Sequence, residues 1–317
     1  MTENIKKNKA IFIVGPTGVG KSRLAVDIAQ QLNAEIISAD SMQIYRHMDI
    51  GTAKVTEEEK INIKHYMLDI VEPDEPFSVE DFQKQAFELI DKINQKNKVP
   101  IIVGGTGLYI NSLVYKLEFT MAKADWNLRK ELEKLAEEKG AEYLHEELKK
   151  VDSISADRIE VNNVKRVIRA LEIYKTTGKP MSYFNKDFRE KNNDMDIYMI
   201  ALNDDREVLY NRINKRVDEM IEDGLIDEVK HILNEIGMDN QSLKAIGYKE
   251  VVGFLNGDYD YEEMIFKLKQ NSRRYAKRQL SWFRRDDRIN WYNLNEYKEY
   301  KDLLNQCLID IKNNLGD

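Results

Sequence analysis

Short apolar runs alternate with longer stretches of helical periodicity over most of the chain. Four runs have the length and composition of buried strands, at residues 10–14, 35–38, 99–103 and 197–202. Between most of them, apolar residues recur every three or four positions, as in amphipathic helices. Strands that alternate with helices usually pair in parallel, so the pattern predicts an α/β fold whose parallel sheet is covered by helices on both faces.

The alternation is interrupted by a block that contains only helical patterns. The stretch WNLRKELEKLAEEKG carries Leu128, Leu132 and Leu135 on one predicted face, and NNVKRVIRALEIYKTTGKP begins after Asn162 or Asn163. Each ends at a glycine, a common helix terminator. We therefore expect a helical insertion, residues 120–188, in a core formed by residues 1–119 and 189–317.

Composition narrows the class of protein. The 317 residues are 42% hydrophobic, enough for a substantial core, and no apolar run approaches the roughly 20 residues of a membrane span. The N-terminus does not resemble a secretion signal, so a cytoplasmic protein is expected. Because Cys307 is the single cysteine and the four histidines are far apart in sequence, no disulfide framework or zinc site is predicted.

Charge is unevenly distributed. The net charge is −7, which argues against indiscriminate nucleic-acid binding, but residues 267–288 contain nine Lys or Arg and only two acidic residues. A helix there places Arg274 and Arg278 four residues apart on one face, with Ala276, Leu280 and Phe283 facing inward. Such a stripe suits phosphodiester oxygens, although a solvated helix face is the competing interpretation.

A phosphate-binding loop follows the first predicted strand. The sequence GPTGVGKS matches the pattern G-x-x-x-x-G-K-S and leads into a helical segment, a context in which backbone N–H groups and the helix N-terminus bind anionic oxygens. Lys21 would place a positive charge on the terminal phosphates, and the Ser22 hydroxyl would ligate Mg²⁺. The predicted binding residues are Gly15, Pro16, Thr17, Gly18, Val19, Gly20, Lys21 and Ser22.

The loop fixes a class of ligand but not a reaction. Regulatory GTPases need D-x-x-G and N-K-x-D motifs, which are absent, and the strand VPIIV ends in Gly-Gly-Thr rather than in the acidic residue of many ATPases. Asp40 and Thr106 follow two predicted strands at the sheet edge where ligands bind, and they could serve as a proton acceptor and an oxyanion donor. Both could equally be turn residues. Arg206, Arg212 and Arg216 lie on a predicted amphipathic helix that could reach the phosphates.

Seven segments together resemble the bacterial tRNA dimethylallyltransferases. They are GPTGVGKS, ISADSMQIYRHMDIGTAK, IIVGGTGLYI, NNVKRVIRALEIY, GLIDEV, AIGYKE and RRYAKRQLSWFRRD, in this order. The resemblance implies a P-loop NTPase-like core and transfer of a dimethylallyl group, with Mg²⁺, from dimethylallyl diphosphate to the exocyclic amine of the adenine 3′ to the anticodon. It also implies that the phosphate loop holds the prenyl diphosphate, although such loops usually indicate ATP.

The resemblance also assigns roles to residues. It implies catalysis by Asp40, Thr106 and Lys21, and contact of Arg212 or Arg216 with the diphosphate. The residues expected to contact the tRNA anticodon stem-loop are Asp40, Ser41, Met42, Gln43, Thr106, Arg129, Lys165, Arg166, Val167, Ile168, Arg169, Arg274 and Arg278. No membrane and no obligate protein partner are expected; this is compatible with a monomer, but the sequence leaves the oligomeric state open. Rival functions are a prenyltransferase of free adenine nucleotides, a small-molecule kinase and a non-enzymatic RNA-binding ATPase.

Overall fold

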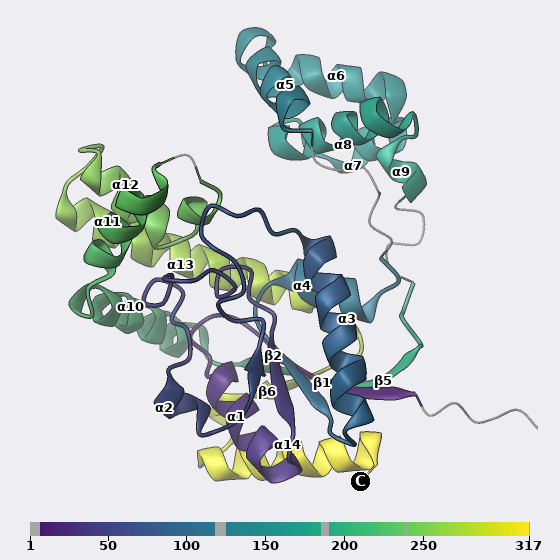
Figure 1. Cartoon of the computed structure of the whole chain (residues 1–317), viewed down its shortest axis with the longest axis vertical. Helices are drawn as coiled ribbons and strands as arrows, with labels where there is room; N and C mark the ends of the chain where they lie inside the picture. Colours follow the sequence, from purple (N-terminus) through teal and green to yellow (C-terminus); the bar gives the residue numbers. More distant parts are fainter. Residues whose placement is uncertain (1–6, 118–124, 185–189, 239, 317) are drawn as a thin grey trace, which may run out of the picture. The chain divides into compact units, whose positions relative to one another are not determined.

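A computed structural model describes residues 7–117, 125–184, 190–238 and 240–316 of the chain. The chain divides into two compact units: Met1–Leu113 together with Asn193–Asp317, and Val114–Asn192 (Figure 1). The second unit is thus wider than the insertion predicted at residues 120–188, because the segments that flank its helices pair with each other instead of joining the sheet.

The first unit is built on a six-stranded, entirely parallel sheet, which confirms the predicted fold class. The strand order is β3-β2-β4-β1-β5-β6. The strands are β1 (Asn8–Val14), β2 (Glu35–Ser38), β3 (His65–Tyr66), β4 (Pro100–Val103), β5 (Met195–Asn203) and β6 (Ile289–Asn293). The pattern predicted the four central strands but neither edge strand, since β3 has two residues and β6 is only partly buried.

Helices cover both faces of this sheet. The described helices of this unit are α1 (Lys21–Leu32), α2 (Glu57–Lys60), α3 (Val79–Gln95), α4 (Gly107–Val114), α10 (Arg206–Glu222), α11 (Leu225–Ile236), α12 (Tyr248–Leu255), α13 (Tyr261–Phe283) and α14 (Tyr300–Leu315), with 3-10 turns at Ser242–Lys244 and Leu294–Glu296. Ile11 and Ile13 join a buried cluster with α1 and α14. Phe12 points to the opposite face because side chains alternate along a strand, and α3 packs against the sheet there.

A separate cluster attaches the segment after β2 to the C-terminal helices. Ile44, Tyr45 and Met48 are buried among apolar residues of α10 to α13, including Val229 and Tyr248. The segment that begins at the sheet edge is therefore supported by residues from much later in the sequence.

The second unit consists of α5 (Trp126–Lys139), α6 (Ala141–Val151), α7 (Ser153–Arg158), α8 (Val164–Thr177) and α9 (Met181–Phe184). Leu132 is buried, and Leu128 and Leu135 pack against the same cluster, which confirms the predicted face of α5. Asn163 lies at the N-cap of α8 as predicted, but its side chain makes no capping hydrogen bond.

The two links between the units form a short antiparallel ribbon. Tyr115 forms a β-bridge with Lys191, the Lys116 N–H donates to the Glu190 carbonyl at 2.8 Å, and the Asn192 N–H donates to the Val114 carbonyl at 3.0 Å. The entry and exit of the helical unit therefore lie side by side. None of the described helices is long and apolar enough to cross a membrane.

Candidate active site

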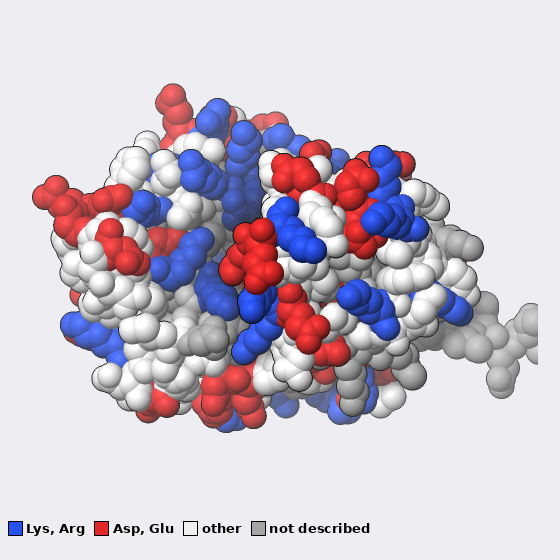
Figure 2. Space-filling view, turned by 90° about the horizontal axis from the view of Figure 1, so that it is seen from above, with Lys and Arg blue, Asp and Glu red and all other residues white. Residues whose placement is uncertain are grey.

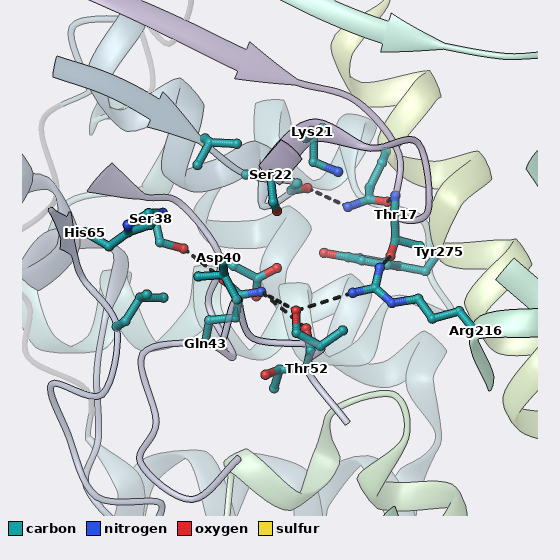
Figure 3. Close-up of a pocket in the computed structure, with 17 residues that line it drawn as sticks. Thr17, Lys21, Ser22, Ser38, Asp40, Gln43, Thr52, His65, Arg216 and Tyr275 are labelled. Carbon is teal, nitrogen blue, oxygen red and sulfur yellow. Dashed lines mark hydrogen bonds between the residues drawn. The ribbon is translucent and has the colours of Figure 1, made fainter. Parts of the chain in front are cut away.

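A cavity opens at the carboxyl ends of β1, β2 and β4, entirely within the first unit. It encloses about 680 Å³ of empty space, part of it open to solvent. In Figure 3, the Asp40 carboxylate and the Tyr275 hydroxyl point into the space beside Lys21 and Ser22. One cavity thus brings together segments that the sequence predicted separately. They are the phosphate loop, the residues after β2, the turn after β4 and helix α10, which carries Arg216.

The phosphate loop has the backbone that anion binding requires. Gly15 has a φ of +135°, and a Cβ atom there would lie 2.6 Å from the Leu202 carbonyl oxygen, so a larger residue does not fit. Helix α1 starts at Lys21, and its N-cap, Gly20, supplies no side-chain hydrogen bond. The first N–H groups of α1 therefore remain available for an anion. Val19 is buried in the core, so it can offer a ligand only its backbone.

The Lys21 side chain is oriented by the phosphate loop and lines the cavity. Its ammonium donates to the Pro16 carbonyl at 2.7 Å. Burial, and next the nearby Arg216 guanidinium, lower the pKa of Lys21 to about 7, while the Asp40 carboxylate acts in the opposite direction. A polyphosphate would supply the missing negative charge and restore the protonated form.

Asp40 and Thr106 are brought together at the sheet edge. The Asp40 carboxylate accepts from the Met42 N–H at 2.9 Å, and the Thr106 hydroxyl accepts from the Ser41 N–H at 3.0 Å. A Cβ atom on Gly104 would lie 2.2 Å from the Ala39 carbonyl oxygen, so this close approach of the two turns requires glycine. Both residues thus belong to turns, as the competing interpretation had it; Asp40 lines the cavity, whereas Thr106 follows Gly105, which lines it.

The structure distinguishes the two candidate arginines of α10. Arg216 lines the cavity, and its guanidinium donates to the Thr17 hydroxyl at 3.4 Å and to the Ala53 carbonyl at 3.3 Å. Arg212 instead forms an ion pair with Asp204 at 2.8 Å and does not line the cavity. Of the two, Arg216 is therefore placed to meet a bound anion.

Two residues of α13 complete the site, and sequence reasoning missed them as site residues. The buried Gln279 carboxamide accepts from the Thr17 N–H at 2.9 Å and donates to the Gly105 carbonyl at 3.0 Å, so it joins the phosphate loop to the turn after β4. Burial, then the Asp40 charge, raise the pKa of Tyr275 to about 12, which keeps its hydroxyl neutral. Their spacing of four within RRYAKRQ, on the same face as Ala276, was the available signal.

Gln43 forms part of the cavity wall that faces the phosphate loop. Its carboxamide accepts from the Ser38 hydroxyl at 3.1 Å and donates to the Thr52 and Ala53 carbonyls, each at 3.3 Å. All these side chains or backbone groups belong to residues that line the cavity. Ser41 and Met42 are half-buried beside it.

A family model described as IPP transferase matches residues 43–286. This chain belongs to the IPP transferase family. It is 54% identical to the tRNA dimethylallyltransferase of Finegoldia magna, with 98% of this chain and 99% of that protein covered. It is 49% identical to the protein of the same name in Clostridioides difficile, covering 98% of this chain and all of that protein.

Solved structures agree with this family assignment. A crystal structure of the tRNA isopentenylpyrophosphate transferase of Bacillus halodurans matches with a TM-score of 0.74 and 45% identity, covering 98% of this chain and 97% of that one. A eukaryotic dimethylallyltransferase captured acting on tRNA matches with a TM-score of 0.83 and 30% identity, covering 97% and 79%. The resemblance predicted from the sequence motifs is thereby confirmed.

The helical unit of this IPP transferase family member exposes part of the predicted RNA contact set. Lys165 and Arg166 are exposed at the start of α8. Val167 and Ile168 were predicted to contact RNA, but their side chains are 0% and 3% exposed and belong to the core of the unit. They shape α8 and cannot reach RNA with their side chains in this conformation.

Arg129 and Arg169 share one buried acidic partner. The Arg129 guanidinium donates two hydrogen bonds to the Glu172 carboxylate, at 2.9 and 3.0 Å, and Arg169 pairs with the same group at 2.5 Å. Arg129 also lies over the exposed Trp126 ring, 4.8 Å from its centroid. Both arginines are thus held in place, and their contact with RNA stays a prediction.

The basic helix predicted near the C-terminus is α13. Arg274 and Arg278 are exposed, while Ala276 and Phe283 are buried, which confirms the predicted orientation of its faces. On the face drawn in Figure 2, Lys and Arg side chains are interspersed with Asp and Glu. Contact of Arg274 and Arg278 with RNA therefore stays a prediction.

Proposed function

We propose that this chain transfers a dimethylallyl group from dimethylallyl diphosphate to the exocyclic amine of the adenine 3′ to the anticodon in tRNA. The observation that supports this most directly is the cavity itself. One side carries the phosphate loop, Lys21 and Arg216, and the other carries the Asp40 carboxylate, in a member of the IPP transferase family. A cationic cradle that faces a carboxylate suits the departure of an anion and the capture of a proton.

In the proposed reaction, the bond between carbon one of the allyl group and the bridging oxygen breaks, and both electrons leave with the diphosphate. Lys21, Arg216 and the loop N–H groups stabilise the charge that accumulates there. The amine lone pair forms the new carbon–nitrogen bond. Asp40 then accepts the proton that the amine sheds, which leaves a neutral secondary amine and diphosphate.

Mg²⁺ is the proposed cofactor, and the residues present suit it. Among the described residues no group of three or more His, Cys, Asp or Glu forms a metal site by itself. Mg²⁺ usually takes one or two protein oxygens and completes its shell with water and phosphate, and Ser22 and Asp40 both offer oxygens to this cavity. When bound, the ion would neutralise charge on the diphosphate.

Acceptance of a tRNA adenine requires its removal from the stacked anticodon loop. Enzymes that modify bases turn them out of the stack into a pocket, and proteins read RNA sequence mainly in single-stranded loops. Gln43 lines the cavity on the same side as Asp40, and Ser41 and Met42 lie between the two in sequence, where they could contact such a base. The exposed Lys165 and Arg166 would contact the RNA backbone.

The test is incubation of the protein with labelled dimethylallyl diphosphate, Mg²⁺ and unmodified tRNA, followed by digestion of the RNA. A labelled adenosine from the position 3′ to the anticodon is the expected product. AMP as acceptor and ATP as donor provide two parallel arms. Labelled AMP without labelled tRNA would indicate the free-nucleotide enzyme, and release of the ATP γ-phosphate to an acceptor would indicate a kinase.

A further inference from the structure

We propose that Glu228 is a positioning residue that holds one wall of the cavity in the shape needed for turnover. Glu228 lies on α11, in the motif GLIDEV, and does not line the cavity. It acts through the backbone of residues 49–51, which directly precede Thr52 and Ala53 of the cavity wall. The inference rests on the proposed function, because turnover here means prenyl transfer.

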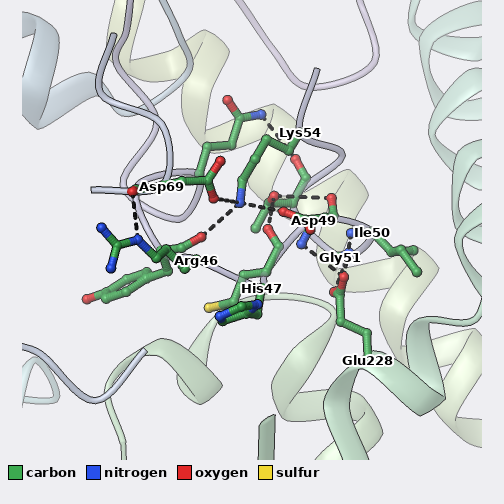
Figure 4. Close-up of polar contacts among 12 residues, drawn as sticks. Arg46, His47, Asp49, Ile50, Gly51, Lys54, Asp69 and Glu228 are labelled. Atoms are coloured by element: carbon green, nitrogen blue, oxygen red, sulfur yellow. Dashed lines mark hydrogen bonds and ion pairs between the residues drawn. The ribbon is translucent and has the colours of Figure 1, made fainter. Parts of the chain in front are cut away.

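The Glu228 carboxylate accepts four hydrogen bonds. One oxygen accepts from the N–H groups of Asp49 and Ile50, at 2.9 and 2.7 Å. The other accepts from the Gly51 N–H at 3.1 Å (Figure 4). This second oxygen also accepts from the Tyr248 hydroxyl at 2.6 Å. Hydrogen bonds to a charged acceptor are about twice as strong as neutral ones, so one side chain fixes three consecutive peptide groups.

The side chains around this carboxylate pack closely against the backbone of residues 49–51. Tyr248 is fully buried, and a Cβ atom on Gly51 would lie 2.5 Å from its ring and 2.9 Å from Leu225. Burial, and next the Glu228 charge, raise the pKa of Tyr248, so its hydroxyl remains a donor. The backbone at Gly51 is therefore pressed against the α11 and α12 side chains in one position.

The carbonyl groups that follow the held segment aim two side chains at the cavity. The Thr52 and Ala53 carbonyls accept from the Gln43 carboxamide, each at 3.3 Å, and Ala53 also accepts from the Arg216 guanidinium at 3.3 Å. A shift of residues 49–51 would move both carbonyls. Glu228 is thus connected to Gln43 and Arg216 through the chain itself.

Other contacts of the segment cannot replace this one. Lys54, whose side chain is only 6% exposed, pairs with Asp49 and Asp69 at 2.6 Å each and donates to the Tyr45 carbonyl at 2.8 Å, but all these groups belong to residues 45–69. Ile44 and Met48 pack against the helices through apolar contacts, which have little directional preference. Glu228 therefore supplies the directional tie between the segment and α11.

The experiment compares Glu228→Gln with Glu235→Gln, an exposed glutamate of the same helix. In Glu228→Gln, one oxygen becomes an NH₂ group, which cannot accept from the Gly51 N–H. We expect the single-turnover rate of prenyl transfer to fall about tenfold to a hundredfold, because a small displacement of active-site groups can reduce a rate by this much. The dissociation constant for dimethylallyl diphosphate should change less than about threefold, because Lys21 and the loop N–H groups are untouched.

Hydrogen exchange supplies a readout that does not depend on activity. The amides of residues 49–51 should exchange at least about tenfold faster in Glu228→Gln, and at the wild-type rate in Glu235→Gln. Tyr248→Phe removes a single hydroxyl without changing the packing, so it should show the same changes to a smaller extent and remains informative if Glu228→Gln folds poorly.

Each outcome has one meaning. Wild-type turnover in Glu228→Gln, or unchanged exchange of residues 49–51, would overturn the proposal. So would a loss of rate matched by an equal loss in Glu235→Gln. If the wild-type protein itself forms no prenylated tRNA, the proposed function fails, and the exchange rates still decide whether Glu228 holds the segment.

Discussion

The two walls of the cavity are built in opposite ways. The wall that would hold the donor centres on consecutive residues, Gly15 to Ser22, which shape an anion site largely by their own backbone, and Arg216 and Gln279 support it from distant helices. The wall at Asp40 depends on distant partners. The Ser41 N–H donates to the Thr106 hydroxyl, 65 residues away in sequence, and the Ile50 N–H donates to the Glu228 carboxylate, 178 residues away. The proposed donor site is thus shaped mainly by one short stretch of the chain, whereas the wall at Asp40 is positioned almost entirely by residues far away in the sequence.

The largest predicted effect separates chemistry from binding. Asp40→Ala should lower the prenyl-transfer rate by about 10² to 10⁴, the usual contribution of a general base, since the amine proton then lacks an acceptor. Donor affinity, measured by equilibrium dialysis with labelled dimethylallyl diphosphate, should stay within about threefold. An unimpaired rate would remove Asp40 from the mechanism.

Lys21→Met, unlike Asp40→Ala, should weaken donor binding as well as lower the rate. It removes a charge-assisted interaction worth about 1.5 to 3 kcal/mol, so the dissociation constant for the diphosphate should rise by about 10- to 150-fold. The rate at saturating donor should also fall, because the departing oxygens lose the same charge. Equal donor affinity in mutant and wild type would show that the diphosphate binds elsewhere.

Gln279→Leu tests the connection between the walls. It leaves the Thr17 N–H and the Gly105 carbonyl without their shared partner, so we expect a decrease in kcat/KM of about tenfold or more. The nearby Ser281→Ala, on the exposed side of α13, serves as the control. A change in melting temperature with no change in kcat/KM would limit Gln279 to stability.

Donor binding should weaken as pH rises. The pKa of Lys21 is about 7, below its ordinary value, so above pH 7 Lys21 has largely lost the proton that a bound diphosphate would favour. Binding must then take up a proton, and the dissociation constant should increase by up to about tenfold per pH unit between pH 7 and 9. Titration calorimetry in two buffers measures the uptake, and Lys21→Met should abolish this component.

The smallest effect concerns the helical unit. Replacing Lys165 and Arg166 by Ala should raise the KM for tRNA several-fold and leave the rate at saturation unchanged. Two lost phosphate contacts should reduce the slope of log K against log salt by about 1.4. The control is Lys134→Ala on the neighbouring α5, and a salt slope equal to that of the wild type would place the RNA on another surface.

This difference between the walls also explains what could be predicted from sequence. The phosphate loop and the four central strands follow from patterns of adjacent residues, and the motif order led to the correct family. The roles of Glu228 and of Arg216 rather than Arg212 depend on which distant segments meet in space, which no local pattern encodes. For Gln279, the spacing of four from Tyr275 was the one local signal. The edge strand β3 was too short for any periodicity to show.

The paired links at Tyr115 and Lys191 make the helical unit an insertion whose two ends lie next to each other. Because its two ends emerge together, a short turn from Leu113 to Asn193 would close the chain without changing the order of the sheet. An insertion of this kind can be gained, exchanged or lost at one point in the sequence without a change in the strand order of the sheet. Engineers could use the same junction to graft a different recognition element onto this chemistry.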